Sequence, residues 1–285
     1  MSVAADTVLL RRRPPGVLAR AVALVRGHLL GLFGVLALAY LLFPIVIVAL
    51  FSFNDPRGRF NYTWEGFTTE HWTRPFGVPG LGDAMAASLE VAAIATVLAT
   101  VLGTLVALAL VRYGFRGRGA TNLLVFMPMA TPEIVLGASL LTLFLNLGVA
   151  TGFWTIVLAH VAFIVSFVVV TVKARLVGFD RHLEEAAMDL GANEWRTFRR
   201  VTLPLIAPGI LAAALLGFAL SIDDFVITNF NAGATVTFPL FIWGAARVGI
   251  PPQVNVIGTI IFLAAVLLML ANVLYQWRRE RAETP

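Results

Sequence analysis

Three carboxylates stand in or beside long apolar segments of this 285-residue chain: Glu133, Asp223 and Asp224. A charged side chain near the middle of a bilayer costs roughly 2.5–3.5 kcal/mol, so such residues are seldom kept without a partner or an aqueous path. Carboxylates along a path would lower the electrostatic barrier to a cationic solute. The alternatives are a structural carboxyl at a kink for Glu133, and an interfacial pair solvated by water for Asp223 and Asp224. All three are candidate substrate-pathway residues.

Asp223 and Asp224 are adjacent, so on a helix they would point in different directions. One can line a pathway while the other caps the following segment, and the sequence leaves open which does which. Phe225 and Trp243 could stack on amine or methylene groups of a cationic ligand. Aromatic side chains are also expected at any membrane interface.

No residue pattern indicates bond-breaking chemistry. The chain has no cysteine, which excludes disulfides, thiolate metal sites and cysteine nucleophiles. The four histidines lack paired metal-ligand spacing, and His160, inside an apolar segment, is expected to hydrogen-bond a neighbouring helix. We therefore expect no catalytic residues and no metal site.

The chain also lacks a nucleotide-binding loop. A phosphate-binding P-loop ends in Gly-Lys-Ser/Thr, whereas the single lysine, Lys173, is followed by alanine. The chain should therefore bind no cofactor of its own, and any ATP and magnesium would be held by another subunit.

Long apolar segments must position these residues. The chain is 59% apolar and only 13% charged, with a mean hydropathy of +0.87. Uncharged runs longer than about 18 residues indicate transmembrane helices, and a turn at 146–152 divides the longest run into two. We predict an all-α, polytopic membrane protein with six spans at about 29–53, 84–111, 121–145, 153–172, 205–227 and 253–277.

The basic residues orient these spans. Seventeen of the 21 Lys and Arg residues fall on one side if both termini are cytoplasmic. The sequence pI of about 10.4 therefore reflects topology, and we expect no nucleic-acid partner. The predicted parts are a cytoplasmic segment at 1–27, a six-helix transmembrane domain at 28–277 with a cytoplasmic loop at 173–204, and a cytoplasmic tail at 278–285. The first span is expected to be an uncleaved anchor.

The polar block at 180–204 predicts two short helices. Asp180 can cap the first, whose apolar residues recur at helical spacing. Gly191 stands where a left-handed residue would end it, and Asn193 can cap the second. Pro204 is expected to stop the second helix. The apolar stripe of the first helix is Leu183, Ala186, Ala187 and Leu190, and that of the second is Trp195, Phe198 and Val201.

Two roles fit such a hairpin. It could lie on anionic headgroups with Trp195 and Phe198 inserted, or dock into a groove of a cytoplasmic partner. Four acidic residues argue against a surface that binds only anionic lipid: Glu184, Glu185, Asp189 and Glu194.

A longer pattern starts at Glu185: Glu-Ala-Ala, three residues, Gly, nine residues, a β-branched residue, one residue, Leu-Pro. It resembles the signature loop of ABC importer permeases, with Val201 in place of the commoner isoleucine. The resemblance implies an ABC type I importer permease (MetI-like) fold, in which this loop is the coupling helix seated in a cleft of the ATPase. The implied ATPase-coupling residues are Glu185, Ala186, Ala187, Gly191, Trp195, Phe198, Leu203 and Pro204.

These residues carry different roles in the resemblance. Glu185 would set the charge pairing of the loop and Gly191 its bend. Ala186 and Ala187 would allow close approach, while Trp195 and Phe198 would pack behind the loop.

Further segments resemble the spermidine/putrescine branch of these permeases, and within it the second permease subunit. They are Ser52-Phe53-Asn54, the run from Pro132 to Gly137, Gly178-Phe179-Asp180, the run from Ser221 to Phe225, and Val248-Gly249 with Asn255. Sister branches that move iron, anions or opines share parts of them and stay alternatives.

The resemblance also implies an assembly. The chain would form half of a polyamine pathway in the inner membrane, as a heterodimer with a homologous permease. Two copies of a cytoplasmic ABC ATPase and a periplasmic substrate-binding protein would complete it. Rival hypotheses are an ion-driven secondary transporter, which should show internal repeats around a midplane site, and a membrane scaffold without a pathway.

Overall fold

The computed structural model describes residues 17–283. Most of the predicted N-terminal segment 1–27, and the last two residues of the tail 278–285, lie outside this range. Between residues 17 and 283 the chain is helical, and its one strand-like pairing is an isolated antiparallel bridge between Asn54 and Phe67.

Most helices follow one another with short connections, and a longer loop, 52–69, joins the first two. The helices are α1 (Val17–Phe51), α2 (Glu70–Thr73), α3 (Leu81–Arg112), α4 (Arg118–Ala130), α5 (Glu133–Asn146), α6 (Phe153–Val177), α7 (His182–Asp189), α8 (Glu194–Thr197), the π-helical segment η1 (Phe198–Thr202), α9 (Leu203–Ile222), α10 (Val226–Asn231), α11 (Phe238–Val248) and α12 (Pro252–Glu283).

Five helical stretches among the described residues are long and apolar enough to cross a membrane, and the α4–α5 pair can supply a sixth crossing. The third predicted span, 121–145, is broken in the structure: α4 and α5 meet at 110°. Pro132 has no N–H and forces the preceding Thr131 into an extended conformation, with ψ of 132°. The fifth span also differs, because α9 ends at Ile222 and not at 227.

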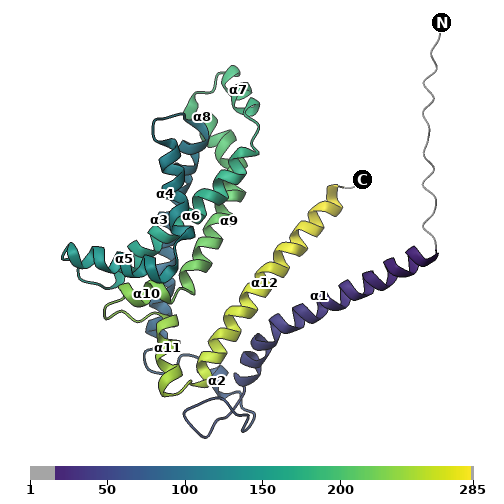
Figure 1. Cartoon of the computed structure of the whole chain (residues 1–285), viewed down its shortest axis with the longest axis vertical. Helices are drawn as coiled ribbons and strands as arrows, with labels where there is room; N and C mark the ends of the chain where they lie inside the picture. Colours follow the sequence, from purple (N-terminus) through teal and green to yellow (C-terminus); the bar gives the residue numbers. More distant parts are fainter. Residues whose placement is uncertain (1–16, 284–285) are drawn as a thin grey trace.

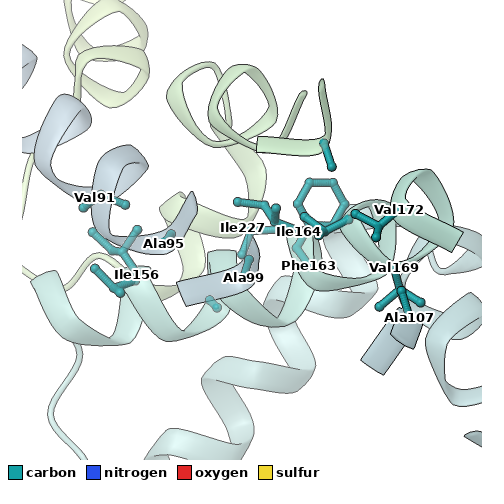
Figure 2. Close-up of a cluster of buried hydrophobic side chains, with 14 of the residues drawn as sticks. Val91, Ala95, Ala99, Ala107, Ile156, Phe163, Ile164, Val169, Val172 and Ile227 are labelled. Atoms are coloured by element: carbon teal, nitrogen blue, oxygen red, sulfur yellow. The ribbon is translucent and has the colours of Figure 1, made fainter. Parts of the chain in front are cut away.

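Small residues let α3, α6 and α9 pack as the central bundle, and Figure 2 shows part of its buried apolar cluster. A Cβ atom added at Gly103 would lie 2.6 Å from Cγ1 of Val168, and one at Gly217 would lie 2.6 Å from Cγ2 of Ile164. The backbones of neighbouring helices therefore approach closely, as is typical of helix contacts in membranes. The bundle positions the C-terminal ends of α3 and α9, which carry Arg112 and Ser221.

Helices α1 and α12 lie together and diverge from this bundle (Figure 1). The spanning window of α1 within Leu29–Phe51 has no buried residue in this chain. An apolar helix with so little contact to its own chain offers its surface to lipid or to another subunit.

The segment Ser52-Phe53-Asn54 organises the loop that follows α1. Nδ2 of Asn54 donates to Oδ1 of Asn61 at 2.6 Å and to the carbonyl of Thr63 at 2.7 Å. The Phe53 ring stacks on Trp72, with centroids 5.1 Å apart. This motif therefore has a structural role at the end of the molecule that carries α2 and α11 (Figure 1).

Candidate functional site

The polar block folds as the predicted bent helix pair at one end of the bundle (Figure 1). Gly191 follows α7 with φ of +83°, the left-handed conformation that glycine adopts without steric cost. Oδ1 of Asn193 accepts the backbone N–H of Arg196 at 2.9 Å and caps α8. Asp180 lies just before the N-cap position, and its carboxylate accepts the N–H of His182 at 3.0 Å. The predicted bend and the cap at Asn193 are confirmed, whereas the N-cap of α7 is Arg181 and not the predicted Asp180.

The prediction that Pro204 stops the second helix is wrong. Helix α8 continues through η1 into α9, so that Glu194–Ile222 is one continuous helical stretch of 29 residues. The N–H of Leu203 bonds to the carbonyl of Phe198, five residues earlier. This wider turn accommodates the proline ring, which in a regular α-helix would clash with the carbonyl four residues earlier. The end of the loop is therefore joined directly to a membrane-spanning helix.

The apolar stripe of α7 faces a groove and not a packed core. The groove has a volume of about 540 Å³, and Leu190 on its wall is 90% exposed in this chain. Its walls come from both arms of the hairpin: Leu183, Ala186, Ala187 and Leu190 on one side, and Arg200, Val201, Pro204 and Leu205 on the other.

Glu184, and not the motif residue Glu185, holds the hairpin to the bundle. The Glu184 carboxylate pairs with the guanidinium of Arg112 at the end of α3 and accepts the hydroxyl of Thr202 in η1. The Glu184 side chain is 15% exposed, whereas that of Glu185 is 63% exposed and pairs only with His182, at 3.1 Å. Sequence reasoning missed Arg112, because no local spacing connects it to Glu184.

Trp195 and Phe198 contact each other rather than a core. Their rings stack with centroids 5.8 Å apart, and Trp195 is 68% exposed. The expectation that both pack behind the loop therefore fails for Trp195 in this chain, since α8 turns it outward. Leu203 and Pro204 form the start of α9. The coupling roles of these residues stay predictions.

The second polar site is the break between α9 and α10. Asp224 is buried, and its Oδ2 accepts the backbone N–H and the hydroxyl of Thr228, each at 2.8 Å. Asp224, one residue before the N-cap Phe225, thus accepts hydrogen bonds from the first turn of α10, while Asp223 is exposed. His160 confirms the prediction of a bond to a neighbouring helix: Nδ1 lies 2.7 Å from Oγ of Ser221, and Nε2 lies 2.9 Å from Oγ1 of Thr228.

The remaining candidates are Glu133, Phe225 and Trp243. Glu133 is the first residue of α5, exposed directly after the α4–α5 break. Phe225 and Trp243 lie together, with centroids 5.1 Å apart, and the guanidinium of Arg247 lies 4.9 Å above the Trp243 ring. The structure therefore brings the two aromatic pathway candidates, Phe225 and Trp243, together. A path function for any of these residues stays a prediction.

Comparisons with known proteins agree with this architecture. Residues 74–281 match the protein family described as "Binding-protein-dependent transport system inner membrane component". The chain is 39% identical over 247 residues to the spermidine/putrescine transport system permease protein PotC of Escherichia coli K12, covering 86% of this chain and 93% of that protein. It is 37% identical over 235 residues to the putrescine transport system permease protein PotI of the same strain, covering 79% and 83%.

Among solved structures, a bacterial ABC transporter that imports the acidic polysaccharide alginate has a similar fold. Its matching chain gives a TM-score of 0.62 at 18% identity, over 93% of this chain and 98% of that one. The observed helical order therefore occurs in an ABC importer of known structure.

Proposed function

The chain belongs to the family of binding-protein-dependent transport system inner membrane components, and we propose that it forms half of an ATP-driven polyamine importer in the inner membrane. The observation that carries the proposal is the continuous helix from Glu194 to Ile222. It joins an exposed, bent hairpin directly to the carboxylates at Asp223 and Asp224. Movement of the hairpin can therefore reach the membrane-embedded break without crossing a flexible loop.

The hairpin is the proposed contact with the ATPase. Its open groove, its exposed Glu185 and its exposed Trp195 offer apolar, acidic and aromatic surface outside the bundle. The arrangement fits a helix-in-groove interaction, in which apolar residues of α7 and its neighbours meet a cleft in the partner. ATP and magnesium are held by two copies of that partner, and this chain contributes no bond chemistry.

A second permease completes the pathway. The uncovered apolar surface of α1 and its divergence from the bundle support a large interface with a homologous subunit (Figure 1). A periplasmic binding protein delivers the solute, as the family description implies. Both termini and the hairpin lie on the cytoplasmic side, because this placement keeps most basic residues inside.

Polyamines are the proposed cargo. Both relatives described above are named for polyamine transport, and each aligns with this chain over most of its length. The exposed Asp223 and Glu133 supply negative charge, and Phe225, which packs beside Trp243, supplies an aromatic ring that attracts ammonium groups. ATP closes the ATPase dimer, the hairpins of both permeases move, and the bundles open toward the binding protein. Hydrolysis then resets the path.

Reconstitution tests the proposal. The chain, a homologous permease, the ATPase and the binding protein are placed in proteoliposomes, and uptake of labelled spermidine and putrescine is followed with ATP or a non-hydrolysable analogue. We expect uptake only with hydrolysable ATP. Uptake driven by an ion gradient without ATPase would support the secondary-transporter hypothesis. ATP-dependent uptake of iron or anions, but not of polyamines, would support a sister branch.

A further inference from the structure

Polar contacts from neighbouring helices hold both ends of helix α10. Oγ1 of Thr155 donates to the carbonyl of Asn231 at 2.8 Å, at the last turn of α10. Nδ2 of Asn231 donates to the carbonyl of Gly137 in α5 at 3.3 Å. His160 lies at the other end, so α6 contacts both ends of α10. These groups are buried, and a buried polar group that lacks a hydrogen bond costs free energy, so the contacts that they make hold α10 in place.

The two ring nitrogens of His160 contact opposite sides of the α9–α10 break. Nδ1 reaches Ser221, in the last turn of α9, and Nε2 reaches Thr228, in the first turn of α10. Nε2 also lies 3.2 Å from Oδ2 of Asp224. The imidazole is only 1% exposed. A rigid planar ring therefore sets the spacing between the two helix ends.

The hydrogen-bond directions follow from the neighbours. The Thr228 hydroxyl donates to Asp224, so its oxygen is left to accept a hydrogen bond from the Nε2–H of His160. Asp224 then faces the backbone N–H groups of Ile227 and Thr228, the hydroxyl of Thr228 and the imidazole N–H. These donors engage the Asp224 carboxylate and direct it into the protein. Asp223, one residue earlier, is left exposed.

We propose that His160 is a positioning residue for transport, which fixes the α9–α10 break and so determines that Asp223 is presented while Asp224 is turned inward. The inference rests on the proposed function, because it takes Asp223 as a carboxylate of the solute path. His160 itself does not contact the solute.

Two conservative variants test the contacts of the two ring nitrogens of His160 separately. The amide of glutamine reaches about as far as Nε2, so His160→Gln keeps a donor toward Thr228 and Asp224. The amide of asparagine lies near Nδ1, so His160→Asn keeps only the contact to Ser221. In the complete reconstituted importer we expect His160→Gln to retain most spermidine uptake per ATP hydrolysed. His160→Asn should lower that ratio about tenfold, as expected for loss of a buried contact to a carboxylate.

A merely structural role predicts a different result. Both variants would then lower the amount of assembled complex similarly, and each assembled complex would keep its normal ratio of uptake to hydrolysis. That outcome would overturn the proposal.

Thiol labelling gives a readout that does not depend on transport. The natural chain has no cysteine, so Ile227→Cys places a single thiol at a position that is fully buried beside the break. We expect a cationic, membrane-impermeant thiol reagent to leave it unmodified with His160 present and to modify it in the His160→Asn background. Labelling after unfolding in detergent gives the total amount of thiol, against which the labelled fraction is calculated. Continued protection in that background would contradict the proposal.

Asp223→Asn separates this inference from the proposed function. If uptake is unchanged in Asp223→Asn while the labelling result is as expected, the path role of Asp223 fails and the positioning of the break by His160 stands. If uptake falls but the buried thiol stays protected in His160→Asn, the path role stands and the His160 inference fails.

Discussion

The carboxylate of Glu184 pairs with the guanidinium of Arg112, 72 residues earlier in the chain. The same carboxylate accepts the hydroxyl of Thr202, to which Arg112 also donates, at 3.3 Å. Three segments therefore meet at one ion pair: the end of α3, the first turn of α7, and η1. The hairpin is fastened to the bundle at this point and is free at its groove.

Loss of this fastening should uncouple hydrolysis from uptake. Glu184→Ala leaves the partly buried Arg112 without its carboxylate partner, at a cost on the order of 1–3 kcal/mol to the local fold. We expect ATPase activity with strongly reduced spermidine uptake. Glu185→Ala is the matched control, because its exposed carboxylate contacts only His182. That control should keep the fold and weaken co-purification of the ATPase, and equal behaviour of the two variants would refute the assignment.

The bend at Gly191 should tolerate asparagine but not valine. A Cβ at this position would meet no atom within 4 Å, so the constraint is the φ of +83° alone. A left-handed conformation costs a β-branched residue roughly 1–2 kcal/mol, whereas asparagine adopts it more readily. Gly191→Val should therefore lose bound ATPase and uptake, and Gly191→Asn should keep most of both in pull-down and vesicle assays. Full activity of Gly191→Val would show that the bend is dispensable.

Close packing in the bundle predicts a steric defect at Gly217. An added methyl would lie 2.6 Å from Cγ2 of Ile164, so Gly217→Ala should destabilise the bundle by about 1–3 kcal/mol. The melting temperature in detergent should fall, and Ile164→Ala in the same chain should restore part of it. Gly34→Ala is the control, because no atom lies within 4 Å of its added Cβ. An unchanged melting temperature for Gly217→Ala would contradict the observed approach of α6 and α9.

The negative charge of Asp223 should increase the uptake of a cationic solute. Asp223→Asn removes an exposed carboxylate at the α9–α10 break, and we expect spermidine uptake to fall about tenfold at saturating loaded binding protein, equivalent to about 1.4 kcal/mol. Asp223→Glu should retain uptake. Asp83→Asn removes the same charge from an exposed position at the start of α3 and serves as the control. Equal uptake by the two asparagine variants would remove Asp223 from the path.

Local sequence patterns predicted the helices and turns well where the conformation depends on interactions within one segment. The apolar runs gave the spans, and the spacing around Gly191 and Asn193 gave the bent hairpin, because capping and left-handed turns depend on adjacent residues. The same local reasoning failed at Pro204. Whether a proline ends a helix depends on the hydrogen bonds of the preceding turn, and here η1 widens to accommodate it.

The sequence by itself determined a helical membrane protein with a polar hairpin on its basic side, because hydropathy and charge act on each segment independently of the others. Only the tertiary structure decided the partners: Glu184 with Arg112, His160 with Ser221 and Thr228, and Asp224 turned inward while Asp223 stays exposed. Adjacent aspartates have the same chemistry and nearly the same sequence context. What distinguishes them is that Asp224 accepts hydrogen bonds from Ile227 and Thr228 in the next helix and lies against His160 of α6, more than 60 residues away along the chain, while Asp223 stays exposed.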